Sequence, residues 1–502
     1  MDKPLSSVNF ILLGTVFSIS ICSWFVFGAD FIYSQYDAYY YASVADNLIS
    51  GKGFSVGSSI PSDPVLTPQN GVVVFHWLFN MMGVSSIEMR LILISFVNSI
   101  VLVFSALFIY KLALNLKIDP LVSLLTAISI PVSFYYHAVL LQSINDIYYF
   151  SGCFAILYLS STPNFKKYQW FIIVLALMLP LFRIAGIIVF ISLVLAAIML
   201  KDKERFKYWL MPSVVTVMML LFAMFVQGLV AGGSGEHFNE ILQRSGFEYW
   251  SEHLIKTIVL SLPETFIRFS WFTMKMSITE PLIGVLISVI LLVVLIRAMF
   301  ASIKEKQFVW LALSLFVALN LVFFQVFYAQ PTRYIITIGP ILLLLIFKLI
   351  KNVKICRMMS ASYLLMTLLI AGLAFGKTIL PDDAKHKKQY ADDIKGYLKD
   401  SPSALHSYYP RVTYFLTGQS SYNSVAIACQ QEGAEHILVV GPIEFIRYAI
   451  NTYIDMGHKP SEQYFLPFRY FGYVGSKEPV FYSVVDRVEV LSIRLKCDNL
   501  KI

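Results

Sequence analysis

The sequence has little charge: 14% of its 502 residues are charged, whereas 57% are hydrophobic. A soluble globular chain carries about 25% charged residues and about 45–50% apolar ones. A water-soluble protein of this composition would expose too much apolar surface, and the abundance of Phe, Tyr, Leu and Ile excludes a disordered chain. The composition therefore predicts a polytopic membrane protein.

Other absences narrow the chemistry. The chain has five cysteines, too few for a disulfide-built scaffold. It contains no Walker motif, no G-x-G-x-x-G motif and no zinc-ligand spacing, so no nucleotide-cradling loop is predicted. No N-x-[ST] glycosylation site is present, which favours a bacterial chain. His76 and His137 have no ligand partner at fixed spacing, so the sequence indicates neither a cofactor nor a bound divalent metal.

What the sequence does have is long apolar runs. A bilayer core about 30 Å thick is crossed by a helix of about 20 apolar residues. The sequence predicts eleven spans, at 8–28, 87–112, 120–138, 146–160, 169–182, 184–200, 208–230, 281–300, 308–328, 334–348 and 358–380. A further apolar run, 72–82, is too short to cross, and we expect it to lie along the membrane on its outer face.

Basic residues fix the predicted orientation. With the N-terminus inside, the short inner loops collect most of the Lys and Arg residues of the membrane region, as the positive-inside rule requires. The net charge of +8 therefore reports topology and not a nucleic-acid partner. The two long outer loops, 29–86 and 231–280, carry many acids, so we expect any chemistry on the outer face.

The composition changes after residue 380. Residues 1–380 form the predicted membrane module, and residues 381–502 are long enough for one domain, which an odd number of spans places outside the cytoplasm. Helices are predicted at 391–399 and 423–433, and strands at 436–440, 479–485 and 487–496. We therefore expect a small α/β domain. Cys429 and Cys497 form a disulfide there or remain two separate thiols.

Two acids are candidate catalytic residues. Asp37 lies in the first turn of a Tyr-rich segment whose spacing predicts an amphipathic helix over 36–48, ended by Gly51. Asp146 stands at the outer start of the fourth span. Each carboxylate either only caps its helix or takes part in chemistry, Asp37 as a general base held just above the bilayer.

Three arginines occupy positions where apolar residues would cost less free energy: Arg90, Arg183 and Arg333. A charge near the membrane core costs a few kcal/mol unless it is paired or faces a polar cavity. Snorkelling at a tight outer turn would explain Arg183. The alternative is that the arginines bind an anionic lipid headgroup, because a guanidinium matches phosphate geometry.

Several motifs occur in a familiar order: YDAYYYASVADNLISGKGF, DPVLTPQNGVVVFHWLFNMMG, MRLILISFVNSI, YHAVLLQSIND, LFRIAGIIVF and PTRYIITIGP. Over about residues 1–350 this set resembles the GT-C superfamily of polyprenyl-phosphate-sugar-dependent glycosyltransferases. The resemblance is to the bacterial branch related to protein O-mannosyltransferases and the lipid A aminoarabinose transferase. Many relatives carry Asp-Glu in the first loop, whereas here Ala38 follows Asp37.

The resemblance implies an enzyme and assigns residues. Asp37 matches the catalytic acid of the first loop and Asp146 that of the second. Arg90, Arg183 and Arg333 match basic positions, one or two of which contact the donor phosphate. The implied reaction is inverting transfer of a hexosyl or pentosyl unit from polyprenyl phosphate to an envelope lipid, polysaccharide or protein. It takes place at the outer face of the bacterial cytoplasmic membrane. A glycan polymerase, ligase or flippase, a transporter and a non-catalytic envelope scaffold remain the alternatives.

Overall fold

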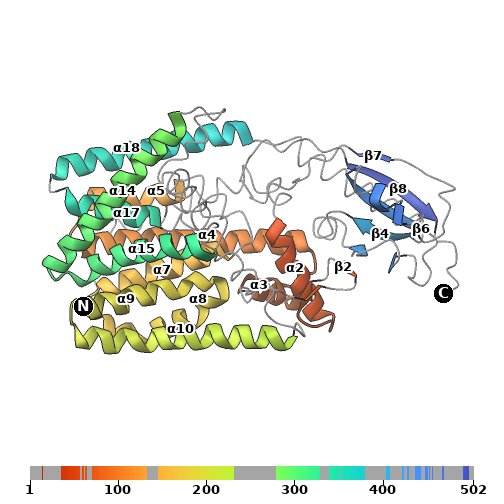
Figure 1. Ribbon diagram of the computed structural model, residues 1–502, viewed down its shortest axis with the longest axis horizontal. Helices are drawn as coiled ribbons and strands as arrows, with labels where there is room; N and C mark the ends of the chain where they lie inside the picture. The colour runs from red at the N-terminus through yellow and green to blue at the C-terminus, as the bar shows by residue number, and fades with distance from the viewer. Residues whose placement is uncertain are drawn as a thin grey trace. The chain divides into compact units, whose positions relative to one another are not determined.

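The computed structural model describes residue 14, residues 36–56, 59–60, 63–64, 71–132, 145–230, 279–327, 338–350 and 352–378, and short segments between 403 and 496. This described part is mostly helical (Figure 1). The chain divides into two compact units. Unit 1 comprises Met1–Val26, Leu66–Gly71 and Ser95–Lys377, and unit 2 comprises Phe27–Val65, Val72–Ile94 and Thr378–Ile502.

Unit 1 is built from apolar helices. Its helices are α4 (Ile87–Asn115, of which residues 95–115 belong here), α5 (Pro120–Val132), α7 (Asp146–Ser161), α8 (Gln169–Phe182), α9 (Ile187–Met199), α10 (Lys203–Val230), α14 (Thr279–Lys304), α15 (Phe308–Phe327), α17 (Gly339–Leu349) and α18 (Val353–Thr378). Short turns join those whose connections the structure describes in full, as between α7 and α8 and between α9 and α10. Single 3-10 turns, at Phe165–Tyr168 and Ile184–Gly186, precede two of the helices.

Four segments within the described part are long and apolar enough to cross a membrane: Ile87–Asn115, Phe165–Phe182, Lys203–Ala223 and Val285–Lys304. The chain is thus a membrane protein. Every predicted span from 87–112 onward coincides with a helix over its described residues, and the short run 72–82 is α3 (Gly71–Met81). The first predicted span lies outside the described residues except for Gly14. The count of eleven spans and the orientation stay predictions.

The helices of unit 1 pack through large apolar side chains and a few buried polar ones. Helix α9 packs against α10 and α15, and Phe190 and Phe316 are fully buried. The Tyr149 hydroxyl donates a hydrogen bond of 3.0 Å to Oδ1 of Asn320, which joins α7 to α15 in the buried interior. Such interhelical hydrogen bonds are a common means of fixing helix pairs in membranes.

Unit 2 contains α2 (Tyr36–Ile49), α3 from Val72 onward and the first turns of α4. Val44 and Ala45 of α2 pack against Val73 of α3 in one apolar cluster. Helix α2 ends at Gly51, where φ is +73°, because glycine adopts this left-handed conformation without steric cost. The prediction of a helix over 36–48 that ends at Gly51 is therefore confirmed.

The described tail segments form a mixed four-stranded sheet in the order β4–β6–β8–β7, with only β4 and β6 parallel. The predicted strand 436–440 lies within β6, and the predicted strand 487–496 contains β8. Of the predicted helix 423–433, residues 427–428 are described as helical. The predicted elements 391–399 and 479–485, with Cys429 and Cys497, lie outside the described residues. The domain boundary at 380 stays a prediction. The strands are β4 (Ser403–Ser407), β6 (His436–Pro442), β7 (Leu466–Phe468) and β8 (Val490–Lys496).

Short strands of the first loop also belong to unit 2. Strand β1 (Ser55–Val56) pairs with β3 (Asp63–Pro64). Strand β2 (Ser59–Ile60) pairs in parallel with β5 (Ser421–Tyr422) of the tail. The first loop and the tail therefore share backbone hydrogen bonds, although more than 300 residues separate them in sequence.

Candidate functional site

Helix α2 carries the first candidate acid. Asp37 is the second residue of this helix, while its side chain lies outside the described part of the structure. The next residue, Ala38, is fully buried. The position after Asp37 is thus a packing position, which suits a small apolar side chain and not a second carboxylate.

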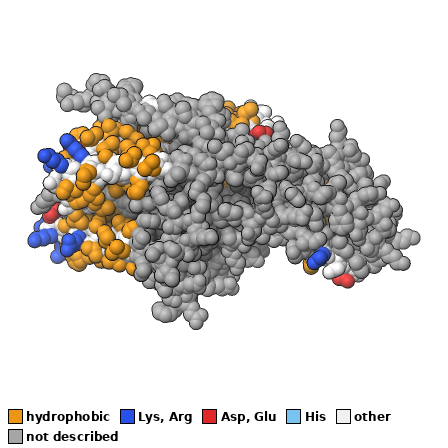
Figure 2. All heavy atoms as spheres, turned by 90° about the horizontal axis from the view of Figure 1, so that it is seen from above, with side chains coloured by type: hydrophobic (Ala, Val, Ile, Leu, Met, Phe, Trp, Pro, Cys, Tyr) orange, Lys and Arg blue, Asp and Glu red, His pale blue; other side chains and the backbone are white. Residues whose placement is uncertain are grey.

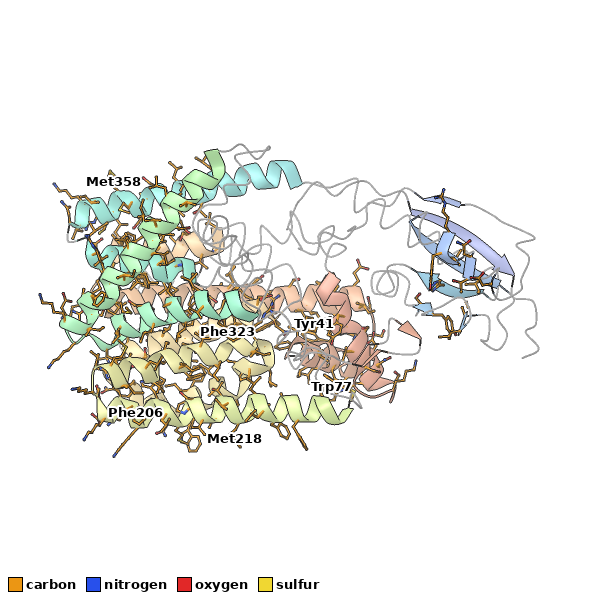
Figure 3. The ribbon with its side chains drawn as sticks, in the orientation of Figure 1. Tyr41, Trp77, Phe206, Met218, Phe323 and Met358 are labelled. Atoms are coloured by element: carbon orange, nitrogen blue, oxygen red, sulfur yellow. The ribbon has the colours of Figure 1, made fainter. Side chains whose placement is uncertain are left out.

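Arg90 anchors α2 to the two elements that follow it. Its Nη1 atom lies 2.7 Å from Oδ1 of Asp46 on α2 and donates a hydrogen bond of 3.4 Å to the carbonyl oxygen of His76 on α3. Asn80 of α3 donates to the same Asp46 oxygen at 3.1 Å. Arg90 therefore joins α2, α3 and α4, the three helices shown around Tyr41 and Trp77 in Figure 3.

The surroundings of Arg90 are buried and unusually polar. The Arg90 side chain is 0% exposed and that of Asp46 is 20% exposed. Among the described residues, Nε and Nη2 of Arg90 and both ring nitrogens of His76 have no hydrogen-bond partner. Complete burial, with the positive charge of Arg90 nearby, holds the pKa of His76 well below its usual value. His76 is therefore neutral at physiological pH, and Arg90 retains donor groups for a further acceptor.

Asp146 and Arg183 form the second cluster, in unit 1. Both Nε and Nη2 of Arg183 approach one carboxylate oxygen, Oδ1 of Asp146, at 2.8 and 2.5 Å. The Asp146 side chain is 1% exposed and that of Arg183 is 9% exposed. The carboxylate thus compensates a guanidinium that would otherwise be a costly buried charge, and snorkelling does not describe this arginine.

The local sequence explains why this pair meets. Helices α7 and α8 are joined by seven residues, so the start of α7 and the end of α8 lie at the same end of a helical hairpin. Gly152 permits the close approach, because a Cβ atom there would come within 2.5 Å of Leu179 on α8. The rings of Tyr148 and Phe182 stack with centroids 4.8 Å apart, directly beside the pair.

Comparisons with known proteins bear on the fold. No protein-family model matches the sequence, and no curated protein matches it. Solved structures do match. ArnT from Cupriavidus metallidurans bound to undecaprenyl phosphate matches with a TM-score of 0.58 and 11% identity, over 97% of this chain and 98% of that one. The Archaeoglobus fulgidus oligosaccharyltransferase tethered to an acceptor peptide matches with a TM-score of 0.53 and 11% identity, over 90% and 71%.

This chain has the GT-C fold. Both matched proteins are members of that superfamily, so the resemblance predicted from the motifs is confirmed at the level of fold. A third match, the Archaeoglobus fulgidus oligosaccharyltransferase AglB with an inhibitory peptide and a dolichol-phosphate, has a TM-score of 0.52 and 11% identity, over 92% of this chain and 73% of that one.

Within this GT-C fold, the structure brings some of the predicted site residues into contact with acids. It pairs Arg183 with Asp146, both of them predicted, and it pairs Arg90 with Asp46. Arg333 lies outside the described residues. The sequence analysis did not single out Asp46, although the helical spacing distinguishes it from Asp37. Asp46 is nine residues, or two and a half helical turns, from Asp37, so the two acids lie on opposite faces of one helix.

The described residues contain no cluster of three or more His, Cys, Asp or Glu side chains able to hold a metal ion. Asp46 and Asp146 are each committed to an arginine instead. The Nε and Nη2 donors of Arg90, which have no partner among the described residues, are able to bind an anion, and the Arg90–Asp46 contact holds α2 against α3 and α4.

Proposed function

We propose that the protein is an inverting glycosyltransferase. It transfers a hexosyl or pentosyl unit from polyprenyl phosphate to an envelope lipid, polysaccharide or protein, at the outer face of the bacterial cytoplasmic membrane. The observation that carries the proposal is the GT-C fold shared over nearly the whole length of ArnT, which was crystallised with undecaprenyl phosphate. AglB, with its dolichol-phosphate, supports the same class of donor.

Asp37 is the proposed general base. It accepts the proton of the acceptor hydroxyl or amine as that atom attacks the anomeric carbon, while the bond to the phosphate oxygen breaks and polyprenyl phosphate leaves. Inversion follows from this single displacement. The anchoring of α2 by Arg90 supports the assignment, because a base must be held in reach of the reacting atom. Asp146 is the second proposed acid and acts by holding Arg183.

Arginines are the proposed contacts of the donor phosphate: Arg90, Arg183 and Arg333. Arg183 lies at the turn between α8 and α9 with its guanidinium fixed by Asp146. Arg90 retains Nε and Nη2 without a partner among the described residues, so it can bind Asp46 and a phosphate oxygen at once. Charge-assisted hydrogen bonds to the leaving phosphate would stabilise the transition state.

The transfer is proposed to need neither a cofactor nor a divalent metal. Asp37 lacks the neighbouring carboxylate of its relatives, and the buried Ala38 leaves no second ligand at that position. We expect activity in purified, EDTA-treated protein equal to that of untreated protein. Loss of activity with EDTA and its recovery with Mg²⁺ or Mn²⁺ would overturn this part of the proposal.

Cell-free transfer of labelled sugar from polyprenyl phosphate to envelope extract tests the function. Asp37→Asn keeps the size of the side chain and removes the base, so we expect normal membrane insertion with transfer reduced by about 10²–10⁴-fold. Asp202→Asn is the matched control, since Asp202 lies in the turn between α9 and α10 and its described side-chain contacts are with Arg205. Wild-type transfer by Asp37→Asn would exclude Asp37 as the base.

A second candidate is supported by the match to the oligosaccharyltransferase: transfer of a whole lipid-linked glycan in one step. Mass spectrometry of envelope glycans from deletion and complemented cells separates the two. Loss of a single sugar residue on an otherwise intact acceptor supports the first proposal, and loss of a complete glycan supports the second. The molecule that loses mass identifies the acceptor.

A further inference from the structure

Five helix ends in the described structure close with the same backbone motif. In each, the residue two places beyond the helix has a positive φ. Its N–H donates a hydrogen bond to the carbonyl oxygen three residues earlier. The N–H of the following residue donates to the carbonyl oxygen five residues before that residue. This is the Schellman motif. The residues at the positive-φ position are Gly51 after α2, Gly83 after α3, Lys117 after α4, Lys201 after α9 and Lys306 after α14.

Two of these helix ends have glycine at the positive-φ position and three have lysine, and the room available for a side chain does not explain the difference. A Cβ atom at Gly51 or Gly83 would meet nothing within 4 Å, so glycine serves only the backbone angle there. Lys117, Lys201 and Lys306 adopt φ of 60°, 55° and 52°, where a side chain is sterically unfavourable. They are the only non-glycine residues with positive φ in the described part of the chain.

The three lysines belong to one end of unit 1, which we call the basic end: the turns that follow α4, α7, α9, α14 and α17. Contacts between side chains connect these turns in sequence around the bundle. They are Asn115 to Ser161, Lys166 to Glu204, Arg205 over the ring of Phe308, Glu305 to Lys348, and Arg357 to Asp119.

The acids of the basic end are already compensated. Arg357 donates two hydrogen bonds to Asp119, at 3.0 and 2.7 Å, and these hold the pKa of that carboxyl below its usual range. The other acids at this end, Asp202, Glu204 and Glu305, are ion-paired with Arg205, Lys166 and Lys348. The charges of the three positive-φ lysines therefore have no ion-pair partner in the described structure.

These lysines also border lipid-facing surface. Lys117, Lys201 and Lys306 are exposed, and large apolar side chains exposed within about two turns of them include Leu121, Ile198 and Phe300. Figure 2 shows Lys and Arg side chains gathered at one edge of the described surface, beside a band of hydrophobic side chains. A border of basic and apolar side chains is typical of the depth at which lipid headgroups lie.

We propose that Lys117, Lys201 and Lys306 form a binding surface for anionic phospholipid headgroups of the inner leaflet. Each lysine is exposed at a helix end closed by backbone hydrogen bonds, has no ion-pair partner among the described residues, and lies within about two turns of exposed apolar side chains. A headgroup phosphate bound there also meets the basic side chains nearby, which gives the surface a preference for anionic over zwitterionic lipid.

Two simpler explanations for these lysines are the helix dipole and the positive-inside rule, and neither accounts for their positive φ. A lysine in the last turn of a helix serves both effects equally well at ordinary φ, and Lys304 has such a position in the last turn of α14. Glycine at the two helix ends of unit 2 shows that the motif itself does not require lysine.

Thermal unfolding of the purified full-length protein in mixed micelles tests the proposal. Micelles contain either phosphatidylcholine alone or phosphatidylcholine with phosphatidylglycerol. We expect phosphatidylglycerol to raise the unfolding temperature of the wild type, as a ligand of the folded state does, and the rise to shrink at high salt. Glycerol 3-phosphate added to phosphatidylcholine micelles separates lipid binding from binding of a free phosphate.

The triple variant Lys117→Gly, Lys201→Gly, Lys306→Gly carries the decisive comparison. It should unfold no earlier than wild type in phosphatidylcholine, because glycine relieves the strained φ, and should lose most of the rise caused by phosphatidylglycerol. Arginine at the three positions should retain the rise. The control Lys203→Gln, Lys207→Gln, Lys354→Gln removes as many charges from helical positions at the same end.

The outcomes decide the proposal. A glycine triple that keeps the full rise, or a control that loses as much of it, would overturn a specific surface in favour of diffuse attraction by the whole end. A rise produced equally by glycerol 3-phosphate would overturn the lipid as the occupant. Retention by the control and loss by the glycine triple supports the surface, independently of the catalytic proposal.

Discussion

The Arg183–Asp146 pair of the candidate site and the Lys166–Glu204 pair of the basic end both join a basic side chain to a carboxylate, but in opposite surroundings. Arg183 and Asp146 are 9% and 1% exposed, whereas Lys166 and Glu204 are 56% and 70% exposed. A buried pair is costly to break because its remaining partner stays charged in a poor solvent. An exposed pair is screened and contributes little. The difference indicates that the buried pairs fix geometry and the exposed ones mainly balance charge.

Removal of one partner from the buried pair should have the largest effect. Arg183→Ala leaves Asp146 buried without its guanidinium, so we expect a loss of about 3–5 kcal/mol in unfolding free energy. Thermal unfolding in detergent measures it. The double variant Arg183→Gln, Asp146→Asn should recover part of the loss, since it leaves no buried charge. If Arg183→Ala unfolded like wild type, the pair would not be the determinant proposed here.

Buried His76 should make stability depend on pH near neutrality. Its pKa is lowered in the folded state, so the unfolded chain binds more protons as the pH falls below about 6.5. The contribution of neutral His76 is therefore complete above that pH. It is lost on acidification toward the lowered pKa, by up to about 1.4 kcal/mol per pH unit.

Unfolding temperatures measured between pH 5 and 8 check this expectation, with His76→Gln flattening the profile. Burial also lowers the pKa of His406 in the tail. His406→Gln is therefore the control that measures how much of the pH dependence comes from this second histidine. An unchanged slope in His76→Gln would contradict the buried, neutral state of His76.

Exchanging glycine and lysine at the shared helix-end motif should give a smaller effect of predictable sign. Gly83→Ala should cost about 1 kcal/mol of unfolding free energy, because alanine is strained at φ +93°. Lys306→Gly should add about 0.5 kcal/mol, since relief of strain exceeds the extra entropy of glycine in the unfolded chain. Thermal unfolding in zwitterionic detergent measures both changes. If both substitutions stabilised the protein, or both destabilised it, the contrast between the glycine and lysine helix ends would be refuted.

Removal of one partner from an exposed pair should have the smallest effect. Glu204→Ala removes the acid that pairs with Lys166, and we expect a loss below about 0.5 kcal/mol at moderate salt. The same substitution measured at high salt should differ even less from wild type, because screening already weakens the pair. A loss comparable with that of Arg183→Ala would mean that the turns of the basic end depend on their ion pairs for stability.

The elements of the membrane region were predictable because their signals are local. Helix α8 begins at Gln169 and ends at Phe182 as the apolar run predicts, and Gly51 ends α2 because its backbone angle suits glycine. The candidate site was predictable only in part. Asp146 and Arg183 could be named one by one as charges at span ends, but their contact depends on the packing of α7 on α8, through Gly152 and Leu179.

The sequence by itself determined that this is a membrane protein built from apolar helices, since 57% hydrophobic residues with 14% charged ones leave no other class. It also indicated the GT-C resemblance through the order of its motifs. Only the tertiary structure decided what each charge meets: Arg90 meets Asp46, and Lys117, Lys201 and Lys306 have no ion-pair partner within the described part of the chain. The physical reason is that hydrophobicity and turn preference act within a few residues along the chain. The free energy of a buried charge depends on a partner brought close by folding.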